Sequence, residues 1–294
     1  MADTHPADRV GQLLNGAWTV SALACVLATG ADTLLPDDHP AVVLLDEAGL
    51  LEPVDGGYLL AGRDQLRGRE QFAVAGIRSA LGQTADIASG SDGWGAHHDV
   101  VLTAQGEASA AGGRAFADMI ATLPGLGGRF ADGGVLLDVG VGVAALACAF
   151  AEAVPAARVI GLDVEPRALA LAQARIQEKG LADRVEVRLV GIESFDETAV
   201  ADIAHMSPVF IPPAVLPSAM SRLRSALTPG GWLALSGIVK AGADGATRWM
   251  AHNAGGSAVT EADVAELAAA AGFGTPVAPP LPPGAPRVLL LQAV

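Results

Sequence analysis

The sequence predicts an α/β fold, in which a mostly parallel sheet follows a smaller, mainly helical domain. The C-terminal half alternates short apolar runs with helical segments, which is the pattern of strands joined by crossover helices. One apolar run, Val135–Val139, leads directly into a turn spaced by Gly140 and Gly142 and then into a helix over 144–153. A strand, a glycine turn and a helix N-terminus in this order present bare backbone N–H groups and predict a site for a nucleotide-like ligand.

Two acidic residues indicate which ligand suits this turn. Asp138 lies two residues before Gly140, and Asp163 ends the next apolar run, Arg158–Asp163, about 20–25 residues after the turn, where an acid can bind ribose hydroxyls. A carboxylate beside a dinucleotide pyrophosphate would be repelled, whereas the ammonium and sulfonium of S-adenosylmethionine attract it. The pair therefore favours S-adenosylmethionine over a nicotinamide cofactor, although Asp163 alone is also consistent with a helix cap.

Five segments, taken in order, resemble the motifs of class I S-adenosylmethionine-dependent methyltransferases. They are LLDVGVG at 136–142, VIGLDVEP at 159–166, the acid-bearing segment 190–193, the apolar run 201–206 and the turn into a strand at 227–235. The resemblance covers residues 131–294 and implies a Rossmann-like, seven-stranded methyltransferase sheet. The chain departs from the family at Ala144, where the family prefers glycine, and at Glu193, because Ile192 occupies the usual position of the acid.

The resemblance implies that 131–294 binds S-adenosyl-L-methionine and releases S-adenosyl-L-homocysteine. The expected cofactor-binding residues come from the first two motifs, the segment near the adenine and the end of the fourth strand. They are Asp138, Gly140, Gly142, Asp163, Val164, Gly191, Ile192, Glu193 and His205. The two departures from the family leave open a protein that binds the cofactor without transferring its methyl group.

Residues 1–85 predict a helical domain that resembles a winged helix. Trp18–Thr29 and His39–Ala48 are the helix candidates, and the first is expected to be buried because its apolar residues lie on most faces. Asp55-Gly56 separates two apolar runs, which is a strong signal for a β-hairpin.

Winged helices often bind DNA, but the charge of this module argues against that function. Residues 1–85 contain five arginines, no lysine and eleven acidic residues, so the net charge of 5 − 11 = −6 would repel phosphate. In small-molecule O-methyltransferases that resemble this layout, such a module dimerises and covers the active site. The resemblance therefore implies a homodimer, and a structural cap without dimerisation is the alternative.

Composition limits the partners and the compartment. A net charge of −14 disfavours nucleic acid as a substrate and the anionic surface of a membrane. Cys25 and Cys148 lie in apolar surroundings and are expected to be buried thiols, and no cysteine and histidine spacing indicates a metal site. The N-terminal MADTHPADRV lacks the organisation of a signal peptide. We expect a soluble, cytoplasmic protein.

Residues 86–130 are expected to form connecting helices that wall the substrate pocket, as in the resembled enzymes. A turn-rich segment around Trp94 comes first, and one or two helices follow over 97–123, broken near Gly112-Gly113. The residues expected to face the acceptor are Trp94, His97, Met206, Phe210, Trp249 and His252. Adjacent residues of a helix point in different directions, so at most one of His97 and His98 should face the pocket.

Methyl transfer from a sulfonium requires alignment and exclusion of water, and a general base only for a weakly acidic hydroxyl. The resembled plant-type O-methyltransferases carry a histidine base about nine residues after the acid of the fourth strand. Counted from Asp202, that position is Ile211, which cannot act as a base. His205 is the first candidate instead, with packing in the core or near the adenine as its alternative role, and His98 is the second.

The predicted function is transfer of a methyl group from S-adenosylmethionine to a small molecule, most readily a hydroxyl of a secondary metabolite. The segment Ser207–Phe210 does not match the N-P-P-Y/F signature of amino-methylating relatives, because serine and valine replace two of its residues. N- or C-methylation, or a non-methylating catalyst or binding protein on the same fold, are the alternatives.

Overall fold

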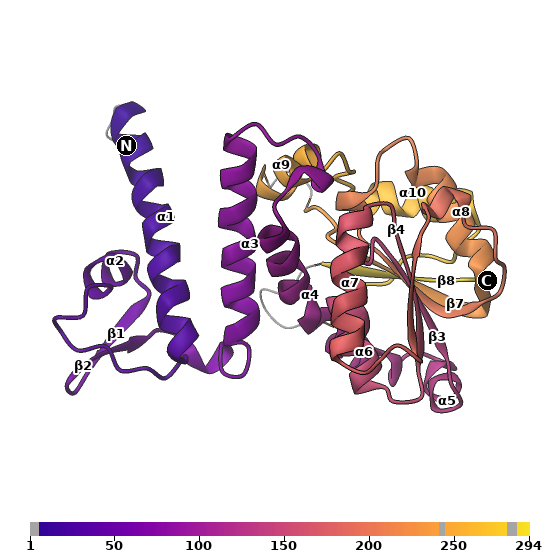
Figure 1. Cartoon of the computed structure of the whole chain (residues 1–294), viewed down its shortest axis with the longest axis horizontal. Helices are drawn as coiled ribbons and strands as arrows, with labels where there is room; N and C mark the ends of the chain where they lie inside the picture. The colour runs from indigo at the N-terminus through magenta and orange to yellow at the C-terminus, as the bar shows by residue number, and fades with distance from the viewer. Residues whose placement is uncertain (1–5, 241–244, 281–286) are drawn as a thin grey trace. The chain divides into compact units, whose positions relative to one another are not determined.

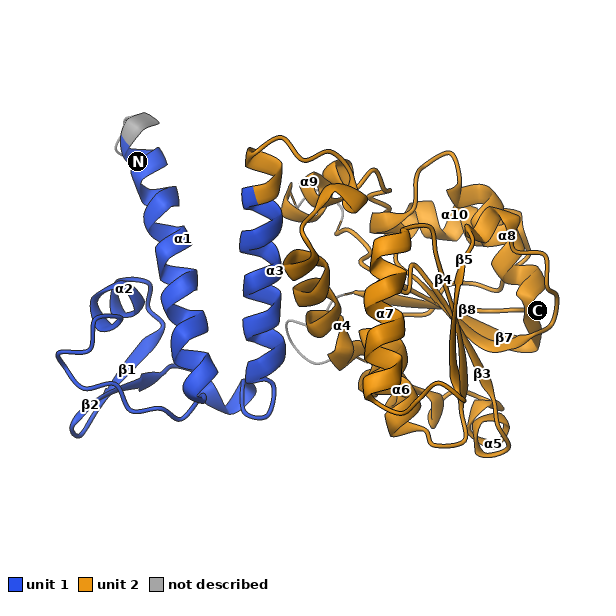
Figure 2. Cartoon of the chain, in the orientation of Figure 1, with its two compact units in different colours: residues 1–85 blue, residues 86–294 orange. Residues whose placement is uncertain are grey.

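The computed structural model forms two compact units, Met1–Ala85 and Asp86–Val294 (Figure 1, Figure 2). The residues that it describes are 6–240, 245–280 and 287–294. The first five residues, where the segment considered for a targeting signal begins, lie outside the described residues.

The first unit builds a small core from helices and one hairpin. Its elements are α1 (Pro6–Thr29), α2 (Val42–Glu47), β1 (Leu51–Val54), β2 (Gly57–Leu60), the 3-10 turn η1 (Arg63–Gln65) and most of α3 (Glu70–Ala88). β1 and β2 pair antiparallel across the Asp55-Gly56 turn, which confirms the predicted hairpin. Gly57 has a φ of 145°, and a Cβ there would overlap the carbonyl oxygen of Leu35, so glycine lets the hairpin lie directly against that segment.

Helix α1 is longer and far more exposed than the sequence predicted. Its last turns join the core through Val26 and Leu27, but Leu13 and Trp18 are 75% and 68% exposed. Cys25 is exposed as well, so the expectation of a buried thiol was wrong there, whereas Cys148 is buried. Residues 8–29 contain an 18-residue window with a mean hydropathy of 1.4, and by length and composition alone this helix could span a membrane. Apolar composition alone does not show whether a helix is buried in the core or exposed, which is why the predicted burial was wrong.

The second unit contains a sheet in the order β5-β4-β3-β6-β7-β8, in which β8 is antiparallel and the other strands are parallel. The strands are β3 (Val135–Val139), β4 (Arg158–Asp163), β5 (Val185–Leu189), β6 (Ala201–Met206), β7 (Leu227–Ser236) and β8 (Val288–Gln292). Seven strands were expected. Among the described residues only isolated bridges extend the sheet beyond β8, from Val277 to Leu290 and from Phe273 to Ala293. Prolines at 276, 279 and 280 lack the N–H groups that a longer ladder needs.

Helices cover both faces of this sheet (Figure 1). On one face α4 (Asp99–Ile120), α5 (Leu126–Ala131), α6 (Ala145–Ala153) and α7 (Pro166–Glu178) contribute to a core with strand residues such as Leu136. On the other face α8 (Leu216–Ala226) and α10 (Glu261–Ala271) pack with Leu137 and its neighbours. Leu136 and Leu137 belong to different cores because successive strand residues point to opposite faces.

Helix α4 runs without a break through Gly112 and Gly113, where the sequence predicted an interruption. These glycines allow α6 to approach closely. A Cβ on Gly113 would overlap the carbonyl oxygen of Leu146 and lie 2.8 Å from the backbone nitrogen of Phe150. Each glycine weakens a helix by about 1 kcal/mol relative to alanine, and contact with α6 offsets this cost.

We expect Gly113→Ala to lower the free energy of unfolding by about 2–3 kcal/mol, since backbone atoms must shift to admit the new methyl group. Gly112→Ala is the matched control, because its Cβ would meet the flexible end of Leu146, with Cδ1 at 3.3 Å. That control should change the same free energy by less than about 1 kcal/mol. Urea denaturation of both variants measures the difference, and equal losses would contradict the close approach of α4 and α6.

Candidate active site

The glycine turn after β3 is open on the side where a ligand would lie. Gly140 and Gly142 have φ values of 74° and 55°, in the left-handed region that favours glycine. A Cβ added at either residue would meet no described atom within 4 Å. The N–H groups of Gly140 and Val141 donate to the carbonyl oxygen of Leu162, at 2.9 and 3.0 Å, and tie the turn to β4. The turn is therefore fixed in place while the space in front of it stays free.

Ala144 adopts the same left-handed conformation, with a φ of 56°, directly before α6. This conformation costs an alanine about 1–2 kcal/mol, which accounts for a preference for glycine at this position. The methyl group is fully buried in the core, and its burial offsets about 0.8 kcal/mol of that cost. The departure from the family motif thus leaves the shape of the turn intact.

Asp163, the last residue of β4, holds the turn from the side. Its Oδ2 accepts a hydrogen bond from the N–H of Gly142 at 2.7 Å, and its Oδ1 accepts one from Glu165 at 2.9 Å. Burial raises the pKa of Asp163, and the charge of Asp138 acts in the same direction. Asp163 therefore caps the following turn and also lies beside the open space at Gly142. Val164, which comes next, is 69% exposed.

Asp138 belongs to a buried polar row that crosses β3, β6 and β7. Nδ1 of His205 lies 2.8 Å from Oδ1 of Asp138, and Nε2 of the same ring lies 2.9 Å from Oγ of Ser236. The ring of Phe116, from α4, packs edge-on against the imidazole at a centroid distance of 5.1 Å. Both nitrogens of His205 are thus occupied by protein groups, and neither is left to take a proton from a substrate.

The segment expected near the adenine follows β5 and forms the 3-10 turn η3 (Ile192–Ser194). Ile192 is buried in the core, whereas Glu193 is exposed. A Cβ on Gly191 would lie 2.5 Å from the carboxylate oxygens of Glu193, so this glycine makes room for that carboxylate. Glu193, which lies one residue after the position that the family uses for this acid, is therefore the residue that reaches solvent beside the end of β5.

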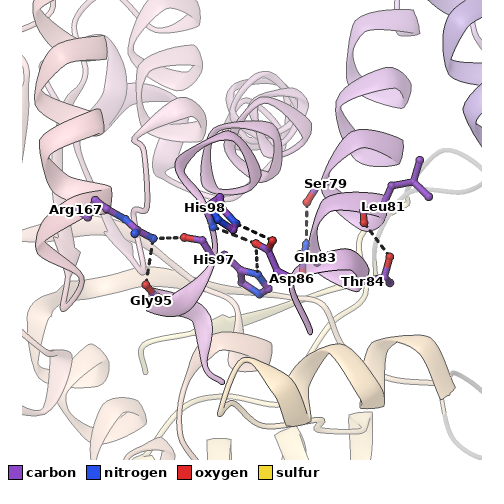
Figure 3. Close-up of polar contacts among 9 residues, drawn as sticks. All are labelled: Ser79, Leu81, Gln83, Thr84, Asp86, Gly95, His97, His98 and Arg167. Atoms are coloured by element: carbon purple, nitrogen blue, oxygen red, sulfur yellow. Dashed lines mark hydrogen bonds and ion pairs between the residues drawn. The ribbon is translucent and has the colours of Figure 1, made fainter. Parts of the chain in front are cut away.

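Figure 3 shows two histidines bound to one carboxylate, that of Asp86. Oδ2 of Asp86 accepts the backbone N–H of His98 at 3.0 Å and lies 3.1 Å from Nδ1 of His97, while Oδ1 lies 2.8 Å from Nδ1 of His98. The hydrogen bond from the His98 backbone, followed by those from the two rings, lowers the pKa of Asp86 to about 2. Asp86 was not among the residues predicted from the sequence.

The two histidines differ in their surroundings. They lie in extended backbone before α4 and not within a helix, so both rings can reach Asp86. The side chain of His97 is 3% exposed and that of His98 is 77% exposed. Among the described residues, Nε2 of His97 has no hydrogen-bond partner.

Trp94 links His97 to the end of β6. Its ring lies 5.3 Å from that of His97 and 4.8 Å from that of Phe210, both in edge-on contacts. Trp94 begins the 3-10 turn η2 (Trp94–Ala96), and Phe210 ends the 3-10 turn η4 (Pro208–Phe210) that follows β6. Three residues predicted to face the acceptor therefore come together at the carboxyl edge of the sheet.

The turn η2 is tied to the elements around it. Arg167, at the start of α7, donates to the carbonyl oxygens of Gly95 and His97 (Figure 3). It also pairs with Asp99 at 2.9 Å. The N–H of Gly93 donates to the carbonyl oxygen of Asn253 at 3.1 Å. These bonds place η2 beside the beginning of α7, close to the second acidic residue of the cofactor motif.

Among the described residues, no ring contact joins the other predicted substrate residues to this aromatic group. Met206 is fully buried in the main core. Trp249 and His252 stack on each other at 5.7 Å on α9 (Gly245–Asn253), and Trp249 is 56% exposed.

A groove of about 570 Å³ lies at the opposite end of the strands. Its lining includes Val135 and Arg158, the first residues of β3 and β4. Ligands of open α/β sheets bind outside the carboxyl ends of the strands. The glycine turn, both acids and the aromatic group are at those ends, so we assign the active site there and not to the groove.

Part of the chain matches a known domain family in sequence. Residues 136–231 match the family described as methyltransferase domain. The ribosomal protein L11 methyltransferase of Vibrio cholerae is 35% identical over 107 residues, which are 36% of this chain and 34% of that protein. The ribosomal RNA small subunit methyltransferase H of Bifidobacterium longum is 36% identical over 78 residues, 26% of this chain and 22% of that protein. The chain thus spans about a third or less of the length of these relatives.

Solved structures resemble the chain over nearly its whole length. Human N-acetylserotonin methyltransferase, in complex with S-adenosylmethionine, has a TM-score of 0.60 at 15% identity and covers 99% of both chains. CalO1, a methyltransferase of calicheamicin biosynthesis bound to S-adenosylhomocysteine, has a TM-score of 0.62 at 17% identity, over 98% of this chain and 99% of that chain. An O-methyltransferase family protein of Burkholderia thailandensis has a TM-score of 0.61 at 15% identity, over 99% of this chain and 98% of that chain.

These likenesses confirm the predicted fold class, with its Rossmann-like sheet and helical N-terminal region. The sequence match over 136–231 adds the motifs of the cofactor turn. Together they show that residues 136–231 resemble the methyltransferase domain family and that the chain as a whole has the fold of the methyltransferase structures it resembles.

Proposed function

We propose that this protein transfers the methyl group of S-adenosylmethionine to a hydroxyl of a small, ring-bearing acceptor, as in secondary metabolism. The observation that carries the cofactor part is the pair Asp138 and Asp163 on either side of an open glycine turn. Two carboxylates here suit the ammonium and the ribose hydroxyls of the cofactor. Exposed Val164 offers an apolar surface to the adenine. The bound cofactor would supply an activated methyl group on its sulfonium.

The acceptor part rests on the group formed by His97, Trp94 and Phe210. Asp86 is ionised and acts as an acceptor, so Nδ1 of His97 carries the proton and Nε2 holds a free lone pair. We assign His97 as the general base, which would take the proton of the acceptor hydroxyl and so prepare its oxygen for the methyl group that the bound cofactor would supply. The two aromatic rings suit a planar acceptor. The net charge of −14 does not favour an RNA acceptor.

Isothermal calorimetry with S-adenosylhomocysteine, followed by incubation with S-adenosylmethionine and a panel of phenols, tests this function. Binding of the product and a phenol that gains one methyl group by mass spectrometry are the expected results. Binding without methylation of any acceptor offered, including amines, would favour a binding protein on this fold. Absence of binding would contradict the cofactor assignment itself.

We further propose that α1 carries the interface of a homodimer. Its exposed apolar residues recur at helical spacing on one side of the helix. They are Val10, Leu13, Leu14 and Trp18, which are 56%, 75%, 60% and 68% exposed. Polar residues at 9, 12 and 15 fill the remaining faces. A single apolar stripe suits a protein partner, whereas a membrane span presents apolar residues on every face.

The double variant Leu13→Glu with Trp18→Glu is therefore expected to be a monomer in light scattering, while the parent chain is a dimer. Gln12→Glu with Asn15→Asp is the matched control, which adds the same charge to exposed polar positions of the same helix and should stay dimeric. A parent chain that is monomeric, or that binds lipid vesicles through α1, would contradict the dimer.

A further inference from the structure

The row Asp138–His205–Ser236 has a defined direction of hydrogen bonding. Asp138 and His205 are register partners on parallel strands, and Ser236 lies two residues beyond Ala234, the partner of His205 on β7. An ionised carboxylate only accepts, so Nδ1 of His205 carries the proton that it shares with Oδ1 of Asp138. Nε2 then accepts from the hydroxyl of Ser236. The serine hydroxyl selects the imidazole tautomer that donates to the aspartate.

The row leaves one oxygen of the nearly buried Asp138 carboxylate without a protein partner among the described residues. The side chain of Asp138 is 3% exposed, and Oδ2 makes no hydrogen bond among the described residues, whereas Oδ1 is held by His205. A buried carboxylate oxygen needs a donor or a cation. Phe116, on α4, packs edge-on against the His205 ring at a centroid distance of 5.1 Å. Burial raises the pKa of Asp163 and the charge of Asp138 acts in the same direction, so two carboxyl groups influence each other at this corner of the turn.

We infer that His205 and Ser236 are positioning residues that hold Asp138 with its free oxygen toward the α-ammonium of the methionyl part of S-adenosylmethionine. They act through Asp138 and do not touch the cofactor. This inference rests on the proposed function, since that function supplies the ligand. It also gives His205 a role different from the base that its position at the end of β6 suggested.

Binding of two ligands distinguishes this positioning role of His205 from a general contribution to the stability of the fold. S-adenosylhomocysteine carries the amino acid part with its ammonium, and 5′-methylthioadenosine has the same nucleoside and thioether without it. Removing a charge-assisted hydrogen bond changes affinity by about 10- to 100-fold. In calorimetry, His205→Leu should weaken the binding of S-adenosylhomocysteine by about 10- to 100-fold and the binding of methylthioadenosine by less than about threefold.

Conservative variants keep the test valid if His205→Leu folds poorly. His205→Asn retains an N–H close to the position of Nδ1 and should restore affinity for S-adenosylhomocysteine to within about tenfold of the parent chain. Ser236→Ala removes the hydroxyl that selects the tautomer and should produce a smaller loss that is still specific to S-adenosylhomocysteine. In an Asp138→Asn background, His205→Leu should have no further effect, because the two residues act through one contact.

The outcomes distinguish this inference from the proposed function. A parent chain that binds neither ligand overturns both. The parent chain could bind both ligands while the His205 variants lose affinity for the two equally, or for neither. That result overturns the positioning role and leaves the cofactor assignment standing. Loss of affinity for S-adenosylhomocysteine alone, with rescue by His205→Asn, supports the positioning role.

Discussion

Asp163→Ala is expected to raise the Kd for S-adenosylhomocysteine by at least about 100-fold. The carboxylate of Asp163 accepts the N–H of Gly142 at 2.7 Å and lies beside the space that the glycine turn leaves open. In the proposed complex it also accepts the ribose hydroxyls. Alanine removes all of these bonds, so the variant loses both the ligand contact and a support of the turn.

Glu165→Ala is the matched control for this prediction. Glu165 lies two residues further on, and its carboxylate caps α7 by accepting the N–H of Arg167 at 3.1 Å. Removing it should cost about 1 kcal/mol of stability and leave the Kd for S-adenosylhomocysteine within about threefold. If both variants lost affinity equally, Asp163 would be a cap and no more.

The pKa of Asp163 adds a dependence on pH. Burial raises this pKa above 3.8, and the ionised form is the one that accepts hydrogen bonds from ribose. Affinity for S-adenosylhomocysteine is therefore expected to fall on acidification, beginning at a higher pH than for an ordinary aspartate. By linkage, a raised pKa in the folded state means that this group's contribution to stability is greatest at low pH and is lost as the pH rises through that pKa. Binding and stability thus respond to Asp163 in opposite directions.

The cofactor turn could be predicted because its signal is local. Strand, acid, glycines and helix follow one another within 135–153, and the second acid comes at a fixed spacing after them. The partners of the histidines have no such signal. Asp86 meets His97 from eleven residues away, and Ser236 meets His205 from 31 residues away. Folding alone brings these pairs together, so the sequence could nominate the histidines without indicating which nitrogen is free.

Two predictions about helices were wrong because the composition of a helix does not show which part of the structure packs against it. Gly112 and Gly113 look like helix breakers in sequence, yet Gly113 lies against the backbone of α6 and the helix continues. The apolar residues of α1 suggest a core helix, yet Trp18 is 68% exposed. The glycine at 113 is explained by the helix that approaches it, and the apolar residues of α1 by the homodimer that we propose. Neither surface can be read from the segment itself.

His97→Gln is expected to lower kcat for a phenolic acceptor by about 10²–10⁴-fold, the usual contribution of a general base. The Kd for S-adenosylhomocysteine should not change, because His97 contacts Asp86 and Trp94 and not the glycine turn.

The comparison with His98→Gln tests whether the loss of kcat in His97→Gln depends on the position of the His97 ring or only on contact with Asp86. Both histidines bind the same carboxylate, but the His98 side chain is 77% exposed and that of His97 is 3% exposed. His98→Gln should therefore keep kcat within about threefold, and Asp86→Asn should lower it by about tenfold or more, because the His97 tautomer is then no longer fixed. Equal losses in both histidine variants would show that the pair supports the fold around Asp86, and the acceptor would have to be deprotonated by another group or need no base.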